Sequence, residues 1–278
     1  MNNKIITIQS QLGYGYVGNN VAGLIIQLHG FDVIALPTVL FSSHTGHKEV
    51  YGAATDPDLF QNIIKGIKTE DFLDNCGYIL SGYFGSCEII DLVCDFVTEF
   101  KQNNPDRIYV CDPVMGDTAQ GGLYVSEKIA ERIIERLIPV SDIITPNHFE
   151  IEYILNCKIH TIEQLLNETE RHPVLKNKII VITSAYLQDT PENKMEVIVL
   201  RKGKAVRLNV DKIKTEIVGT GDLFASVLTS QLALNNDMIN SVNTAIQYIN
   251  DVISYAHGKG YVELNAESLL IFQSRLIK

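Results

Sequence analysis

The stretch KIITIQSQLGYGYVGNNVAGLIIQLHGFDVIALPTVLF, residues 4–41, decides the fold. It begins with a short apolar run rich in β-branched residues (4–9), passes through a glycine-rich turn into a segment of helical period (19–28), and ends in a second β-rich run (33–41). Short buried strands that alternate with helices indicate a parallel sheet, because a helix is the usual connection between parallel strands. We therefore predict an α/β fold.

The same alternation continues to the C-terminus. Further strands are predicted at residues 78–82, 108–111, 142–145, 178–183, 196–201 and 205–210, the last two as an antiparallel pair. Further helices are predicted at residues 57–67, 86–101, 126–137, 148–155, 162–170, 222–234, 237–257 and 266–275. No repeat, low-complexity segment or linker interrupts residues 1–278, so we expect one domain with a central, mostly parallel sheet and helices on both faces.

Composition and charge restrict the possible functions. Hydrophobic residues make up 46% of the chain and charged residues 20%, as in ordinary globular enzymes. The net charge of -10 repels nucleic acid and anionic membranes, so we expect neither as a partner. The five cysteines form no C-x-x-C pair, and no apolar run approaches the roughly 20 residues that span a bilayer. We therefore expect reduced thiols and a cytoplasmic protein.

Polar residues follow the predicted strands directly. They are Ser10, Ser81 to Tyr83, Asp112, Thr145 to Asn147, Thr183 and Ser184. Ligands of open α/β sheets bind outside the carboxyl ends of the strands, so these residues predict a single site assembled from several loops.

The run Gly219-Thr220-Gly221-Asp222 precedes an apolar helical segment. Two glycines allow the backbone N–H groups to converge at a helix N-terminus, which suits an anion. An aspartate at the same turn can accept a proton from a substrate hydroxyl while the N–H groups stabilise a transferring phosphoryl group. A simple helix cap explains a lone G-x-G-D about as well.

Residues 10–19 form a second glycine-rich turn, in which Gly13, Gly15 and Gly18 satisfy G-x-G-x-x-G. A dinucleotide-binding fold would explain this spacing, but the following strand ends without the carboxylate that binds ribose. The turn could equally place Asn19 as a helix cap, or direct the Ser10 hydroxyl at a substrate ring. The chain contains no P-loop motif.

Asp112 and Asp117 lie on a turn that contains proline and glycine, after the strand at residues 108–111. With Glu150 they provide three carboxylates that could face one metal-phosphate centre, since Mg²⁺ prefers oxygen ligands and is often held through water. Asp112 and Glu150 could also be ordinary turn or cap residues.

His44 and His47 stand three residues apart and suggest a metal site. Zinc needs further ligands, and no cysteine or third histidine lies at a supporting spacing, so we expect a polar loop. A serine hydrolase is not supported either, because the chain has no G-x-S-x-G motif.

Taken in order, these segments resemble the pyridoxal kinases, a branch of the ribokinase-like superfamily, over nearly the whole chain. The matching blocks are Ile8-Gln9-Ser10, Tyr16-Val17-Gly18-Asn19, Phe41-Ser42-Ser43-His44-Thr45-Gly46, Ser81-Gly82-Tyr83, Cys111-Asp112-Pro113-Val114-Met115-Gly116-Asp117, Ile144-Thr145-Pro146-Asn147, Val181-Ile182-Thr183-Ser184 and Gly219-Thr220-Gly221-Asp222. The loop at residues 118–123 contains Gly121-Gly122 where some bacterial members have a reactive cysteine, and we interpret it as a flap over ATP.

The resemblance implies transfer of the γ-phosphoryl group of ATP to the 5′-hydroxyl of pyridoxal, pyridoxine or pyridoxamine, with Mg²⁺ and a monovalent cation, in a homodimer. It assigns catalysis to Asp222 and to Gly219, Thr220 and Gly221, and the cations to Asp112, Asp117 and Glu150. The residues that would bind the vitamer ring are Ser10, Val17, Val39, Phe41, His44, Thr45 and Tyr83. Those that would line the ATP side are Tyr124, Thr145, Asn147, Thr183 and Ser184.

Two different functions remain open. A hydroxymethylpyrimidine kinase shares the Asp-Pro-Val-Met segment and the glycine turn, but that family opens with a Ser-Asp-Pro-Ser-Gly-Gly-Ala-Gly-like run that residues 10–19 do not resemble. A non-catalytic protein that binds B6 vitamers should have lost its base or its carboxylates, whereas Asp112, Asp117, Glu150 and Asp222 are all present.

Overall fold

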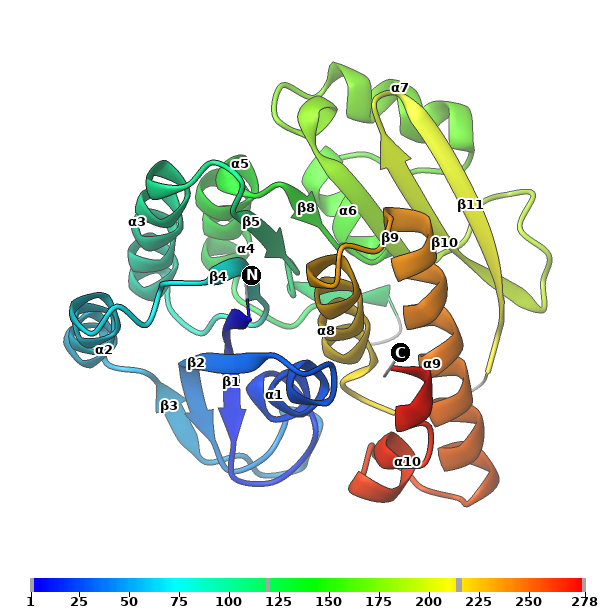
Figure 1. Ribbon diagram of the computed structural model, residues 1–278. Coiled ribbons are helices and arrows are strands. Elements are labelled where there is room, and N and C mark those ends of the chain that lie inside the picture. Colours follow the sequence, from blue (N-terminus) through cyan, green and yellow to red (C-terminus); the bar gives the residue numbers. More distant parts are fainter. Residues whose placement is uncertain (1–2, 119–120, 214–216, 277–278) are drawn as a thin grey trace.

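A computed structural model describes residues 3–118, 121–213 and 217–276, and its centre is a nine-stranded sheet (Figure 1). In spatial order the strands are β11 (Lys204–Asp211), β10 (Lys194–Arg201), β9 (Ile179–Ala185), β8 (Ile143–Ile144), β5 (Ile108–Cys111), β4 (Cys76–Ser81), β1 (Lys4–Leu12), β2 (Asp32–Phe41) and β3 (Gly52–Ala54). The strands from β9 to β2 run parallel, while β10, β11 and β3 pair antiparallel. The predicted mostly parallel α/β sheet and its antiparallel pair are confirmed.

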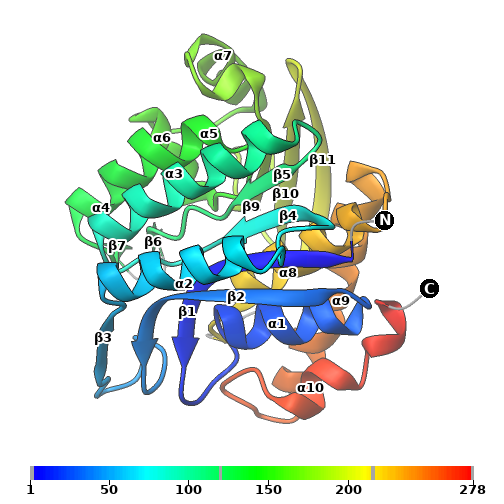
Figure 2. The ribbon, with the colours of Figure 1, turned by 60° about the vertical axis from the view of Figure 1, so that its left-hand side comes forward.

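Helices cover both faces of this sheet (Figure 2). One face carries α2 (Pro57–Thr69), α3 (Cys87–Asn103), α4 (Glu127–Arg132), α5 (Ile138–Val140), α6 (His148–Leu155) and α7 (Ile162–Arg171), and the other carries α1 (Asn19–Leu28), α8 (Thr220–Ala233), α9 (Met238–Gly258) and α10 (Ala266–Leu270). Neighbouring residues of a strand point to opposite faces, so Ile79 joins the core under α3 whereas Leu80 joins the core under α8.

Local sequence explains where most helices begin. Asp56 accepts a hydrogen bond from the Leu59 N–H at the start of α2, and Ser86 accepts from the N–H groups of Glu88 and Ile89 at the start of α3. Short polar side chains at this position bind N–H groups that have no partner within the helix. Because such capping residues can be recognised in the sequence, the predicted starts of these helices differ from the observed ones by only a few residues.

Some predicted elements differ from the structure. The helix expected at residues 126–137 changes to a wider π turn at Ile133–Leu137 and continues as α5. Pro139 explains the widening, because it has no N–H to offer and its ring crowds the carbonyl four residues earlier. The helix expected at residues 266–275 ends at Leu270, and a separate 3₁₀ turn follows at Gln273–Arg275.

The sequence did not predict three short strands. β3 adds an edge to the sheet, and β6 (Gly116–Asp117) pairs antiparallel with β7 (Gly122–Leu123). Residues 119–120 of the predicted flap lie outside the described residues. No helix in the described ranges has the length and apolar character needed to cross a membrane.

Candidate active site

Asp222 lies in the first turn of α8, where two glycine-rich segments meet. Its Oδ2 accepts a hydrogen bond from the Gly18 N–H at 2.9 Å. Gly219 adopts a left-handed conformation (φ 91), and a Cβ there would lie 2.5 Å from the Tyr16 carbonyl oxygen, so only glycine allows this approach. Burial raises the pKa of Asp222 to about 6, although the Gly18 N–H acts against the rise.

The N-terminus of α8 is available to a ligand. Within the described residues no side chain caps this helix, and Gly221 is exposed. The first N–H groups of a helix have no partner inside it and carry partial positive charge. An anion can therefore bind beside the Asp222 carboxylate, as the run of residues 219–222 predicts.

Ser10 and Val17 border the same turn. A Cβ placed on Gly18 would lie 2.2 Å from the Ser10 Oγ, and one placed on Gly219 would lie 2.9 Å from the Val17 Cγ1. The Ser10 hydroxyl of β1 and the carboxylate of α8 thus both lie close to Gly18, as expected if a substrate spans them.

The aromatic wall predicted for a ring comes from two strand ends. The rings of Phe41 and Tyr83 meet edge to face with centroids 6.5 Å apart, and the Thr38 hydroxyl donates to the Tyr83 carbonyl at 2.6 Å. Val39, which was also predicted for the wall, is fully buried beside Gly85.

His44 and His47 converge on Glu263, which is remote in sequence. Their Nε2 atoms lie 3.4 and 2.9 Å from the Glu263 Oε1. The three groups could hold a metal by distance alone, since their ligand atoms lie within 4.8 Å of one another. However, the His44 Nδ1 accepts a hydrogen bond from the Gly46 N–H, so only the Nε2 of His44 is left to face Glu263.

Thr45, predicted to bind the ring, is exposed, and its side chain makes no hydrogen bond in the described ranges. The neighbouring His44 does reach the glycine turns. A Cβ on Gly46 would contact both the His44 ring and the Val218 side chain. The loop that carries Thr45 therefore borders the base of the Asp222 turn.

Asp112 and Glu150 form the acidic side of the site. Asp112 is buried, and its Oδ2 lies 4.0 Å from the position of a Cβ on Gly221. The Glu150 Oε1 accepts from the Met115 N–H at 2.8 Å, and its Oε2 accepts from the Asn147 N–H at 2.8 Å. The interpretation of Glu150 as a cap residue is confirmed, because it completes a capping box with Asn147 at the start of α6.

The buried carboxylates on this side of the site repel one another. Burial, the Glu150 carboxylate and the Asp222 carboxylate raise the pKa of Asp112 well above its ordinary value. Burial raises the pKa of Glu150 to about 7 despite its backbone hydrogen bonds. The Thr145 hydroxyl is buried beside Asp112, and its interaction with that carboxylate acts against the rise. A buried acidic site of this kind fits a divalent cation with phosphate oxygens.

The carboxylates of Asp112, Asp117 and Glu150 do not converge on one point. In the described residues the only group whose ligand atoms lie within 4.8 Å of one another is His44, His47 and Glu263. A Mg²⁺ ion beside Asp112 would therefore need water or phosphate oxygens to complete its shell.

Four of the five residues predicted for the ATP side lie at the ends of β8 and β9: Thr145, Asn147, Thr183 and Ser184. Asn147 donates its Nδ2 to the Gly116 carbonyl at 2.7 Å and forms a parallel bridge with Thr183. Ser184 follows with a positive φ of 50, which is uncommon for serine. The fifth residue, Tyr124, follows β7 and is exposed.

Comparison with known proteins decides the family. A model of the phosphomethylpyrimidine kinase family matches residues 26–265. The human pyridoxal kinase is 36% identical over 238 residues, which cover 81% of this chain and 76% of that protein. The chain belongs to the pyridoxal kinase family. The family expected from the sequence is thus confirmed, as is the kinase class.

Solved structures of this family agree with the fold. The pyridoxal kinase of Leishmania donovani in complex with ADP and pyridoxine superposes with a TM-score of 0.86 at 30% identity, covering 99% of this chain and 96% of that one. A Bacteroides thetaiotaomicron protein provisionally assigned as a phosphomethylpyrimidine kinase, crystallised with pyridoxal, gives a TM-score of 0.87 at 27% identity, covering 99% and 96%. The ribokinase-like fold class is confirmed.

Sequence reasoning missed two contacts in this pyridoxal kinase site. The Gly18 N–H that holds Asp222 could have been suspected from the glycine spacing of residues 13–18, since the third glycine often permits a close backbone approach. Glu263 gave no signal, because it lies in no motif and is separated from His44 by most of the chain.

Proposed function

We propose that this chain transfers the γ-phosphoryl group of ATP to the 5′-hydroxyl of pyridoxal, pyridoxine or pyridoxamine. The relatives support this assignment, since one of them is a pyridoxal kinase with ADP and pyridoxine bound. The observation that carries the proposal is the Asp222 carboxylate, held by the Gly18 N–H beside the uncapped N-terminus of α8.

In the proposed reaction Asp222 accepts the proton of the 5′-hydroxyl as the bond to phosphorus forms. The N–H groups of residues 219–221 stabilise the charge that develops on the transferring group. An alcohol is a weak acid, so the proton transfer comes late, and positioning provides most of the rate enhancement.

The vitamer ring binds on the other side of Asp222 in this proposal. The Ser10 hydroxyl and Thr45 hydrogen-bond to the ring, His44 lies beside it, and Val17, Phe41 and Tyr83 form its walls. Val39, which is fully buried, completes these walls in the proposal.

We propose that Asp112, Asp117 and Glu150 organise Mg²⁺ and a monovalent cation around the phosphates. Bound Mg²⁺ neutralises charge on the β- and γ-phosphates. Tyr124, Thr145, Asn147, Thr183 and Ser184 line the nucleotide side. The raised pKa values of Asp112 and Glu150 support this role, because a nearby cation stabilises their ionised forms.

We further propose that the protein works in the cytoplasm as a homodimer. Five free cysteines support a reducing compartment. The family resemblance supports the dimer.

Substrate competition tests the proposal directly. Turnover with MgATP should be measured side by side on pyridoxal, pyridoxine, pyridoxamine and hydroxymethylpyrimidine. We expect kcat/KM to favour at least one B6 vitamer by about tenfold or more, since hydrogen-bonding groups that do not match the site lower the kcat/KM of the wrong substrate by at least that factor. An equal or reversed preference would support the hydroxymethylpyrimidine kinase. Binding of a vitamer without turnover would indicate a binding protein.

A further inference from the structure

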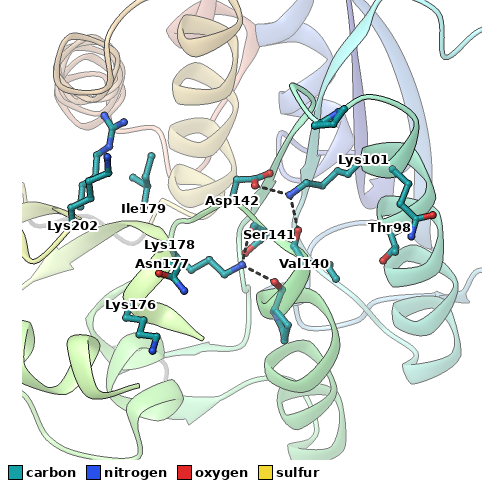
Figure 3. Close-up of a pocket in the computed structure, with 14 residues that line it drawn as sticks. Thr98, Lys101, Val140, Ser141, Asp142, Lys176, Asn177, Lys178, Ile179 and Lys202 are labelled. Atoms are coloured by element: carbon teal, nitrogen blue, oxygen red, sulfur yellow. Dashed lines mark hydrogen bonds and ion pairs between the residues drawn. The ribbon is translucent and has the colours of Figure 1, made fainter. Parts of the chain in front are cut away.

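A cavity of about 750 Å³ lies beside the N-terminal ends of β8 and β9 (Figure 3). Its walls include the segments that enter β8 and β9 and the end of β10. Ligand sites in proteins commonly have volumes of about 300 to 1,000 Å³. The cavity therefore has room for a small molecule.

Positive charge dominates the cavity, although the chain as a whole is acidic. Five basic side chains line it against one carboxylate, Asp142. That carboxylate is already neutralised, because its Oδ1 binds the Lys101 Nζ at 2.6 Å and its Oδ2 accepts from the Tyr109 N–H at 2.8 Å. Glu170 lines only the smaller neighbouring cavity. The net charge of -10 makes this concentration of cations unusual.

Two of the basic groups are fixed by the fold. Lys101 also donates to the Val140 carbonyl, and Lys178 donates to the carbonyl of Pro139 at 2.7 Å and to that of Ser141 (Figure 3). Burial lowers the pKa of the Lys178 ammonium, while the nearby Asp142 carboxylate and Lys101 cation act on it in opposite directions. Both ammonium groups are thus held in place at the wall of the cavity.

Three other basic groups have no acidic partner within ion-pair distance in the ranges that the structure describes. They are Lys176, Arg201 and Lys202, all exposed at the edge of the cavity. The backbone of Lys202 is set by the turn between β10 and β11, where its φ is 51. These groups are available to a ligand that carries more than one negative charge.

The cavity also has an apolar surface. Val140, Pro139 and Ile179 lie between the basic side chains. A ligand that matches both features has a phosphate group for the cations and an apolar body for this surface. A monocarboxylate would leave most of the positive charge unpaired.

We propose that this cavity is a second binding site, for a phosphorylated small molecule with an apolar body. The site is separate from the proposed nucleotide site, because β9 runs from Ile179 in the cavity to Thr183 near its other end, four residues and about 13 Å away at 3.3 Å per residue. The proposal does not depend on the kinase reaction.

Calorimetry with phenyl phosphate and inorganic phosphate tests the site. ADP and pyridoxine are kept at saturating concentrations, so that binding near Asp222 is blocked. We expect one phenyl phosphate per chain, bound more tightly than inorganic phosphate. The double variant Lys176→Gln/Arg201→Gln should weaken it by about tenfold or more, since it removes two cations that can form charge-assisted hydrogen bonds with the phosphate group.

Lys204→Gln is the matched control, because Lys204 is an exposed cation opposite Arg201 on the same hairpin and does not line the cavity. An equal loss in this control, or several weak sites per chain, would overturn the proposal in favour of general charge screening. Acetylation of the wild-type protein provides a test without variants. Phenyl phosphate should protect Lys176 and Lys202 more than Lys204, and uniform protection would contradict the site.

Discussion

Asp222 is the residue on which the proposed chemistry depends. The change Asp222→Asn keeps an oxygen for the Gly18 N–H but removes the proton acceptor. We expect kcat to fall by about two to four orders of magnitude, as for loss of a general base, with KM changed only a few-fold. Steady-state kinetics on pyridoxal measures both values.

The control for this change is Asp237→Asn. Asp237 also lies at a helix N-terminus, where it caps α9, and asparagine caps as well as aspartate. The activity of the Asp237→Asn protein should stay at the wild-type level. A fully active Asp222→Asn enzyme would exclude Asp222 as the base.

The raised pKa of Asp222 predicts the acid side of the pH profile. Only the ionised carboxylate can accept a proton, and its pKa is raised from about 4 to about 6. The value of kcat/KM should therefore fall tenfold per pH unit below about pH 6. Initial rates between pH 4.5 and pH 8 locate this limb. If kcat/KM fell only near pH 4, burial would not raise the pKa of Asp222 in the free enzyme.

At the scale of elements, the contact between the first glycine turn and α8 depends on Gly18. Its φ is 53, and a Cβ there would meet the Ser10 carbonyl oxygen at 2.4 Å. We expect Gly18→Ala to displace the turn, to reduce kcat at least tenfold, and to lower stability by about 1 to 3 kcal/mol. Thermal denaturation and kinetics should be measured on the same sample.

Gly23 provides the matched control. It lies inside α1, where a Cβ would meet no atom within 4 Å. Gly23→Ala should stabilise the protein by about 0.5 to 1 kcal/mol without loss of activity. Similar effects of the two changes would show that the tight approach at Gly18 is unimportant.

The loop that carries His44 and His47 is connected to the C-terminal part of the chain through Glu263. Glu263→Gln removes the charge that faces both rings. We expect KM for pyridoxal to rise about three- to tenfold while kcat changes little, because in the proposed site this loop contacts the ring and not the phosphoryl group. Glu131→Gln, at an exposed position on α4, is the control. A fall in kcat with constant KM would contradict this role.

How far the sequence predicts this molecule depends on the range of the interactions involved. Hydrophobic period and caps are local, so α1, α6 and β5 begin and end where the sequence predicts. Motif spacing also placed Asp112, Asp222 and Ser10 at one edge of the sheet. The contacts of Glu263 could not be predicted, because they join segments with no shared pattern. Neither could the cavity between α3 and β10, which depends on how side chains pack.

At the scale of the whole molecule, buried carboxylates link stability to pH and to metal. The pKa of Glu150 is raised from 4.5 to about 7, so between these values the folded chain holds more protons than the unfolded chain. This contribution to stability is present below about pH 4.5 and is lost as the pH rises through about 7. The melting temperature of the metal-free protein should therefore fall from pH 5 to pH 7.5.

A Mg²⁺ ion bound near Asp112 and Glu150 should oppose this decrease in melting temperature with rising pH. Mg²⁺ with ADP should bind the protein with these carboxylates ionised. The increase in melting temperature that MgADP causes should therefore be larger at pH 7.5 than at pH 5. Asp112→Asn removes one of the interacting carboxylates and should reduce both the decrease with pH and the increase with Mg²⁺. Thermal denaturation in EDTA and in MgADP, at both pH values, measures these effects. Equal pH slopes in the wild-type and Asp112→Asn proteins would place the titrating groups elsewhere and would weaken the assignment of Asp112 and Glu150 to the metal.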